Sequence, residues 1–96
     1  MVHINEELEA AKAAKTAIDF LVTATTKSSV LARLNKAKYA AVLNLSSGGG
    51  ALNEARAHVG IALSNVIHGM PTQEKIDKAK RAIDAWIRGL EASTAA

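Results

Sequence analysis

The chain has 96 residues, of which 49% are hydrophobic and 22% charged, and its formal net charge is +3. This length suits a single domain spanning residues 1–96 with one core, and the composition excludes a wholly disordered protein. Cysteine is absent, which excludes a disulfide framework and thiolate chemistry. No apolar run reaches the ~20 residues of a membrane span. The acids Glu6, Glu7 and Glu9 are unlike a signal peptide, so we expect a cytoplasmic protein without membrane contact.

The apolar pattern predicts a first helix from about Asn5 to Ala24. Asn5 is a favourable N-cap residue, and acids in the first turn interact well with the helix dipole. At about 100° per residue, apolar side chains cover about 200° of this helix, more than a one-sided surface helix needs. Four residues of this wide face are therefore predicted to contact a partner: Ala13, Ala17, Phe20 and Ala24.

A threonine- and serine-rich stretch predicts a break near residues 25–29, followed by a second helix over about 30–44. One face of this helix is broadly apolar. A separate stripe on it consists of Ala32, Tyr39 and Leu43, which we expect to lie in an interface. Without the break, the first two helices would fuse into one rod, and a three-helix fold is the alternative.

Residues 45–50 form a predicted flexible Ser/Gly loop, and a third helix is expected over 51–68. Gly69 is expected to end that helix in the left-handed conformation. Gly60 lies mid-helix in a line of small residues, where glycine costs about 1 kcal/mol relative to alanine. Its presence predicts close approach of another backbone, and we assign it to the partner interface.

The last predicted helix spans about 73–92, with Thr72 as its N-cap and residues 93–96 as a frayed tail. Three acids lie four residues before bases on one face, which predicts ion pairs facing solvent: Glu74–Lys78, Asp77–Arg81 and Asp84–Arg88. Together the four segments predict an all-α fold, a compact and mostly antiparallel bundle of four amphipathic helices.

No motif for catalysis, a cofactor or a metal ion is present. His3, His58 and His68 lack the spacing of metal ligands, and the Ser/Gly loop lacks the lysine of a phosphate-binding loop. We therefore expect no enzymatic activity, no catalytic residues, no cofactor and no bound metal.

The charge distribution supplies a second functional hypothesis. Between Asp19 and Glu54 the sequence has no acid, but it carries four bases: Lys27, Arg33, Lys36 and Lys38. With Tyr39 as a stacking ring, this stretch is the candidate contact of a nucleic-acid-binding module. A ligand carrier with a cavity in the bundle is a third option, which the scarcity of aromatic residues disfavours.

The leading hypothesis is a small non-enzymatic protein-binding protein, a regulator, inhibitor or adaptor of the size typical of compact bacterial or phage genes. It would self-associate, most simply as a homodimer, or dock on another protein through the Ala-rich faces of its first three helices. If it instead binds nucleic acid, Tyr39 must stay accessible beside Arg33 and Lys36.

Overall fold

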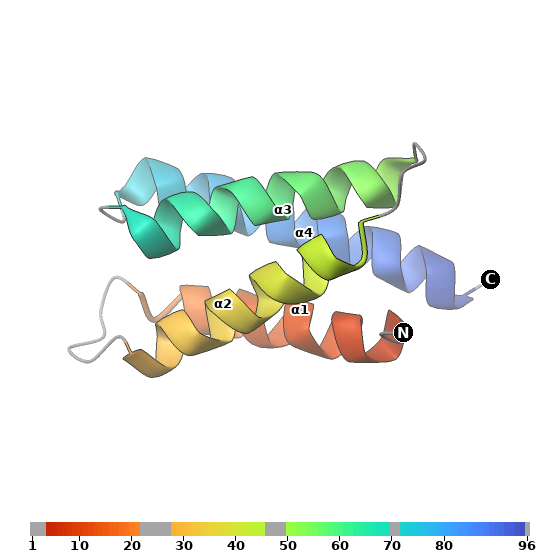
Figure 1. Cartoon of the computed structure of the whole chain (residues 1–96), viewed down its shortest axis with the longest axis horizontal. Helices are drawn as coiled ribbons and strands as arrows, with labels where there is room; N and C mark the ends of the chain where they lie inside the picture. The colour runs from red at the N-terminus through yellow and green to blue at the C-terminus, as the bar shows by residue number, and fades with distance from the viewer. Residues whose placement is uncertain (1–3, 22–27, 46–49, 70–71, 96) are drawn as a thin grey trace.

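The computed structural model describes residues 4–21, 28–45, 50–69 and 72–95. These residues form four helices: α1 (Ile4–Ile18), α2 (Ser28–Leu43), α3 (Ala51–His68) and α4 (Gln73–Ala95). Successive helices run in opposite directions along a bundle measuring 40 × 20 × 19 Å (Figure 1). The predicted all-α four-helix bundle is confirmed. The alternative of a fused rod is wrong, because α1 and α2 pack side by side.

Each helix packs against two neighbours, in the cyclic order α1, α2, α3, α4. Small and large side chains are divided unevenly over the resulting core. Among the described residues, five of the seven buried alanines lie on α1 and α2. The larger side chains come mainly from α3 and α4, including the fully buried Leu63, Ile83 and Trp86. Buried alanines allow helices to lie close together, and the larger side chains fill the remaining core.

Packing on two sides also explains the wide apolar face of α1. This helix contacts both α2 and α4, and its buried residues include Ala11, Ala14, Ala17 and Ile18. A face of about 200° is therefore largely used inside the bundle. The structure buries Ala17 completely, so its assignment to a partner interface is wrong.

The helix boundaries depart from expectation at several ends. α1 begins at Ile4, so Asn5 lies within the helix, and it ends at Ile18 rather than near Ala24. Its end tightens into three-residue turns, in which the amides of Phe20 and Leu21 donate to Ala17 and Ile18. Leu21 folds back into the core at 1% exposure, and Phe20 turns outward.

The later boundaries lie closer to prediction. α2 starts at Ser28, two residues before Val30, and ends at Leu43. Gly69 ends α3 in an extended conformation, with φ −126° and ψ −174°, so the expected left-handed cap is wrong. The N-cap prediction at Thr72 is confirmed, since its Oγ1 accepts a 3.3 Å hydrogen bond from the Lys75 amide. The prediction of a frayed tail over residues 93–96 is wrong as far as Ala95, because α4 continues to that residue.

The charged surface of α4 is built partly across helices. Of the three predicted pairs, Glu74 and Lys78 lie 3.4 Å apart. Asp84 instead pairs with Lys15 of α1 at 3.0 Å, and Lys80 pairs with Asp19, just after α1, at 2.9 Å. These contacts hold α1 against α4 at the surface. Within the described part of the chain, no helix combines the length and apolarity needed to cross a membrane.

Candidate interaction face

The outward stripe of α2 is the first component of a candidate interaction face. The buried residues of this helix, Val30, Leu34, Ala37 and Ala41, recur at helical spacing and face the core. Ala32, Tyr39 and Leu43 point the opposite way at about 100° per residue, and all three are exposed. Tyr39 is 53% exposed and Leu43 is 71% exposed. The separate stripe predicted from the sequence therefore lies on the surface.

A line of small residues on α3 continues this face. Asn53, Ala57, Gly60 and Ser64 are all half-buried and succeed one another at helical spacing. A Cβ built on Gly60 would lie 3.0 Å from Cγ2 of Val42, so this line faces α2. The close approach predicted at Gly60 exists, but its neighbour is a side chain of the same chain and not a backbone.

Val42 completes the surface, which we call the α2–α3 face: Ala32, Tyr39, Val42, Leu43, Leu45, Ala57 and Gly60. Val42 is 43% exposed. Among the residues that the structure describes, four of the six exposed large hydrophobic side chains lie on this face; the others are Phe20 and Ile61, which lines a cavity between α3 and α4. Monomeric proteins seldom leave large apolar patches open.

The end of α2 places Leu45 on this face. Asn44 donates a 2.7 Å hydrogen bond from Nδ2 to the carbonyl of Ala40, and the Leu45 amide donates to Val42. These bonds satisfy carbonyls that a helix end would leave unpaired. α2 ends at Leu43, and Leu45 just beyond it is 40% exposed.

The other predicted interface residues lie elsewhere. Ala13 is exposed on α1, where it lines a groove of about 450 Å³ between α1 and α2. Phe20 is 55% exposed in the turn after α1. Ala24 lies outside the described residues.

The predicted nucleic-acid contacts are placed in a mixed charge environment. Arg33 and Lys36 line the same groove as Glu6 and Glu9, acids that the sequence places far from them. Lys38 is half-buried, with its Nζ 5.2 Å from the centroid of the Tyr39 ring. This lysine lies over the Tyr39 ring, although the Tyr39 side chain is still 53% exposed. Lys27 lies outside the described residues.

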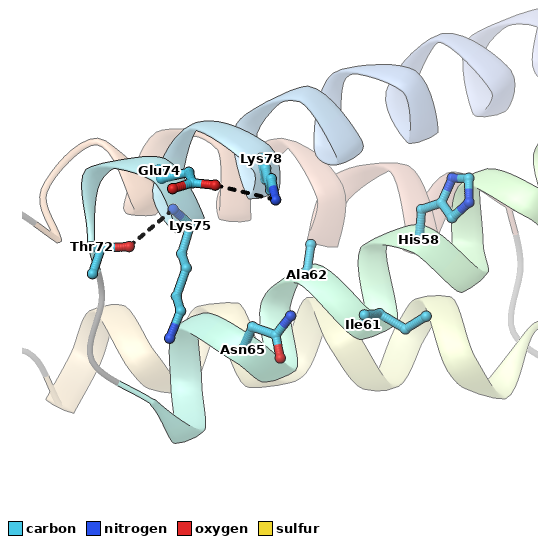
Figure 2. Close-up of a pocket in the computed structure, with 8 residues that line it drawn as sticks. All are labelled: His58, Ile61, Ala62, Asn65, Thr72, Glu74, Lys75 and Lys78. Atoms are coloured by element: carbon cyan, nitrogen blue, oxygen red, sulfur yellow. Dashed lines mark hydrogen bonds and ion pairs between the residues drawn. The ribbon is translucent and has the colours of Figure 1, made fainter.

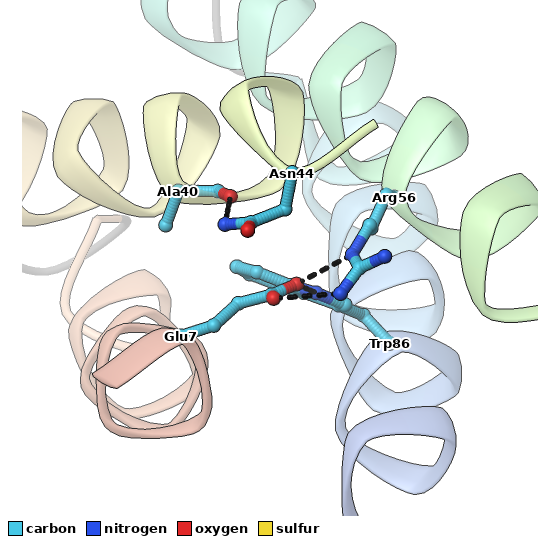
Figure 3. A network of polar contacts seen from close by, with 5 residues as sticks. All are labelled: Glu7, Ala40, Asn44, Arg56 and Trp86. Atoms are coloured by element: carbon cyan, nitrogen blue, oxygen red, sulfur yellow. Dashed lines mark hydrogen bonds and ion pairs between the residues drawn. The ribbon is translucent and has the colours of Figure 1, made fainter. Parts of the chain in front are cut away.

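A buried carboxylate joins three helices inside the bundle (Figure 3). Glu7 of α1 is fully buried. Its two oxygens accept 2.8 Å hydrogen bonds from Nε and Nη2 of Arg56 on α3, a bidentate arrangement. Trp86 of α4 donates from Nε1 to the same carboxylate at 2.7 Å. The geometry is that of a structural clamp, because both Glu7 oxygens accept hydrogen bonds from other helices.

Sequence reasoning missed this clamp, although a signal was present. Glu7 shares its helical phase with Ala11, Ala14 and Ile18, all buried. Its position in the first turn offered a sufficient local explanation through the helix dipole. The buried phase indicated instead an inward carboxylate that required a basic partner.

A second cavity, of about 410 Å³, lies between α3 and the start of α4 (Figure 2). Ile61 and Ala62 supply an apolar wall, and His58, Asn65 and Lys75 are among its polar residues. Its other polar groups are already engaged, since Thr72 caps α4 and Glu74 pairs with Lys78 (Figure 2).

No group of three or more His, Cys, Asp or Glu side chains in the described residues is placed to hold a metal ion. Comparison of the chain with protein-family models, curated proteins and solved structures finds no significant match.

Proposed function

We propose that this chain is a small non-enzymatic protein-binding protein whose contact surface is the α2–α3 face. The observation that carries the proposal is the exposure of Tyr39, Val42, Leu43 and Leu45 along α2 and just after it. Aromatic and aliphatic side chains at the centre of a surface are the usual anchors of protein interfaces.

The contrast with the rest of the surface supports this choice. The outward side of α4 presents exposed charges, among them Glu74, Lys78 and Arg88. α1 contributes Lys15 to a cross-helix ion pair. Surfaces of this kind are well solvated and need no cover, so the α2–α3 face is the part of the molecule that gains most from a partner.

Two occupants satisfy this function, a second copy of the chain or a different protein. Self-association is measured by sedimentation velocity up to high micromolar concentration. Binding of another protein is measured by selecting ligands from a displayed library of 20-residue helical peptides. The library has a fixed apolar stripe and flanking positions varied among Glu, Lys and Gln.

The variant Leu43→Lys tests whether binding uses the α2–α3 face or another surface of the protein. Leu43 is 71% exposed, so the substitution leaves the core intact. We expect it to weaken dimerisation or ligand binding by about tenfold or more, as loss of an interface anchor does. Ala85→Lys adds the same charge at an exposed position of α4 and is the matched control. The proposed function would be contradicted if the protein is a monomer and if no selected ligand binds the Leu43→Lys variant more weakly.

A further inference from the structure

The formal charge of the chain is concentrated on one helix. α2 carries Arg33, Lys36 and Lys38 and no acid. The bases elsewhere in the chain are equal in number to its nine acids, so their charges cancel. The net charge of α2 is therefore that of the whole chain, +3. This helix also presents the stripe of Ala32, Tyr39 and Leu43.

Lysines lie on both sides of that stripe. Lys36 precedes Tyr39 by three residues and is exposed beside it. From the side of α3, the Lys38 ammonium reaches to 5.2 Å from the Tyr39 ring centroid. Among the described residues, neither Lys36 nor Lys38 forms an ion pair. Their charges are thus open to a partner that covers Tyr39.

A second copy is a poor occupant for this surface. In a symmetric dimer the same patch meets itself, so two positively charged α2 helices would face each other, with Glu6 and Glu9 only on the α1 side, where they line a groove with Arg33 and Lys36. Like charges brought together across an interface oppose association. Self-association of the α2–α3 face is therefore disfavoured by its own charge.

Nucleic acid also matches the surface poorly. The stripe and its surroundings expose Val42, Leu43 and Leu45, aliphatic side chains that cannot bind phosphate. Three bases supply few phosphate contacts, and each contact contributes one counterion to the salt dependence of binding.

Building on the proposed function, we infer that the α2–α3 face binds a single amphipathic helix of another protein, with an apolar stripe flanked by acidic residues. The apolar stripe would cover Tyr39 and Leu43, and carboxylates beside it would reach Lys36 and Lys38. On α3, the small side chain of Ala57 allows a helix to approach closely, because interaxial distance depends on the residues at the contact.

The test uses the same displayed helical library and reads the composition of the flanking positions. Wild-type protein is expected to enrich Glu over Lys by about tenfold, the effect of two or three exposed ion pairs. Replacing both Lys36 and Lys38 with Gln should remove this preference while the apolar stripe is still bound. High salt should weaken the preference in the same way. Lys12→Gln with Lys15→Gln, which neutralises two bases on α1, is the matched control.

Each other outcome separates this inference from the proposed function. Suppose that ligands no longer bind the Leu43→Lys variant but show no preference for Glu. This result overturns the inference of an acidic helix and keeps the α2–α3 face as the protein-binding surface. A dimer that Leu43→Lys disrupts also overturns the acidic helix and keeps the protein-binding face, with a second copy of the chain as the occupant. Binding of duplex or single-stranded DNA at about 150 mM salt, lost in the Arg33→Glu, Lys36→Glu double variant, overturns both in favour of nucleic acid. A library without any ligand also overturns both.

Discussion

At the scale of single residues, Glu7 connects α1, α3 and α4 through one carboxylate. Its side chain is fully enclosed, and that of Arg56 is only 12% exposed. Removing two charges from water is costly, and a buried pair stabilises little compared with apolar residues of the same shape. The cost becomes large when one partner is lost, because the other charge stays buried. The clamp therefore favours one register of the three helices more than it adds to total stability.

Glu7→Ala is expected to lower the free energy of unfolding by about 3–5 kcal/mol. The substitution leaves Arg56 without its carboxylate and the Trp86 indole without its acceptor. Urea denaturation followed by circular dichroism measures the change. Glu9→Ala, at an exposed site of the same helix, should stay within about 0.5 kcal/mol of wild type. A loss of less than about 1 kcal/mol for Glu7→Ala would contradict the clamp.

Gly60 permits a second prediction at this scale. A Cβ at Gly60 would meet Cγ2 of Val42 at 3.0 Å, and Val42 is exposed enough to turn aside. Gly60→Ala should therefore change stability by less than about 1 kcal/mol, since the gain in helix propensity offsets the contact. Gly60→Leu should cost about 1–3 kcal/mol by overpacking against α2.

Thermal or urea unfolding of both variants checks this expectation. Val42→Ala, added to Gly60→Leu, should restore part of the loss, because the two residues share one contact. Equal stabilisation by alanine and leucine at position 60 would show that α2 does not constrain this site.

At the scale of elements, ion pairs between helices fasten α1 to α4. Lys15–Asp84 and Lys80–Asp19 join residues that are far apart in the sequence, and all four side chains are partly exposed. Exposed pairs contribute little individually. Their positions nevertheless favour the packing of α1 beside α4, because each base lies within ion-pair distance of its acid only in that arrangement.

Lys80 makes this contact dependent on pH. A hydrogen bond to Asp19, followed by the charge of the same carboxylate, raises the pKa of Lys80 above 10.5. Because the folded-state pKa is the higher one, the stabilisation is complete below pH 10.5 and is lost as the pH rises through the raised value. The difference in Tm between wild type and Lys80→Met should be constant from about pH 7 to 10.5 and shrink above it.

Lys12→Met, on the exposed side of α1, supplies the comparison for this measurement and should show no such trend. A wild-type advantage over Lys80→Met that persists undiminished at high alkaline pH would rule out the Asp19 contact as its source.

At the scale of the whole molecule, the sequence predicts what depends on local pattern. Apolar residues at helical spacing predicted four helices, because each amphipathic helix must bury one side. The Thr72 cap and the outward stripe of α2 follow from the same local periodicity and capping preferences. These features require no knowledge of which helices are neighbours.

The remaining features depend on neighbours that a linear pattern does not reveal. Glu7 meets partners 49 and 79 residues away. Arg33 and Lys36 lie near Glu6 and Glu9 only because α1 and α2 pack side by side. The same holds for Gly89, where a Cβ would lie 3.0 Å from Cδ1 of Leu52 on α3, a close approach that no local signal indicates.

The placement of Trp86 gives the molecule a built-in optical reporter. It is the only tryptophan of the chain, and its indole is buried with its N–H on the Glu7 carboxylate. Its fluorescence therefore reports on the junction of α1 and α4, whereas circular dichroism averages over all the helices. If the two signals change together during unfolding, the bundle opens as one cooperative unit. If the fluorescence changes first, the helices separate at the clamp before they melt.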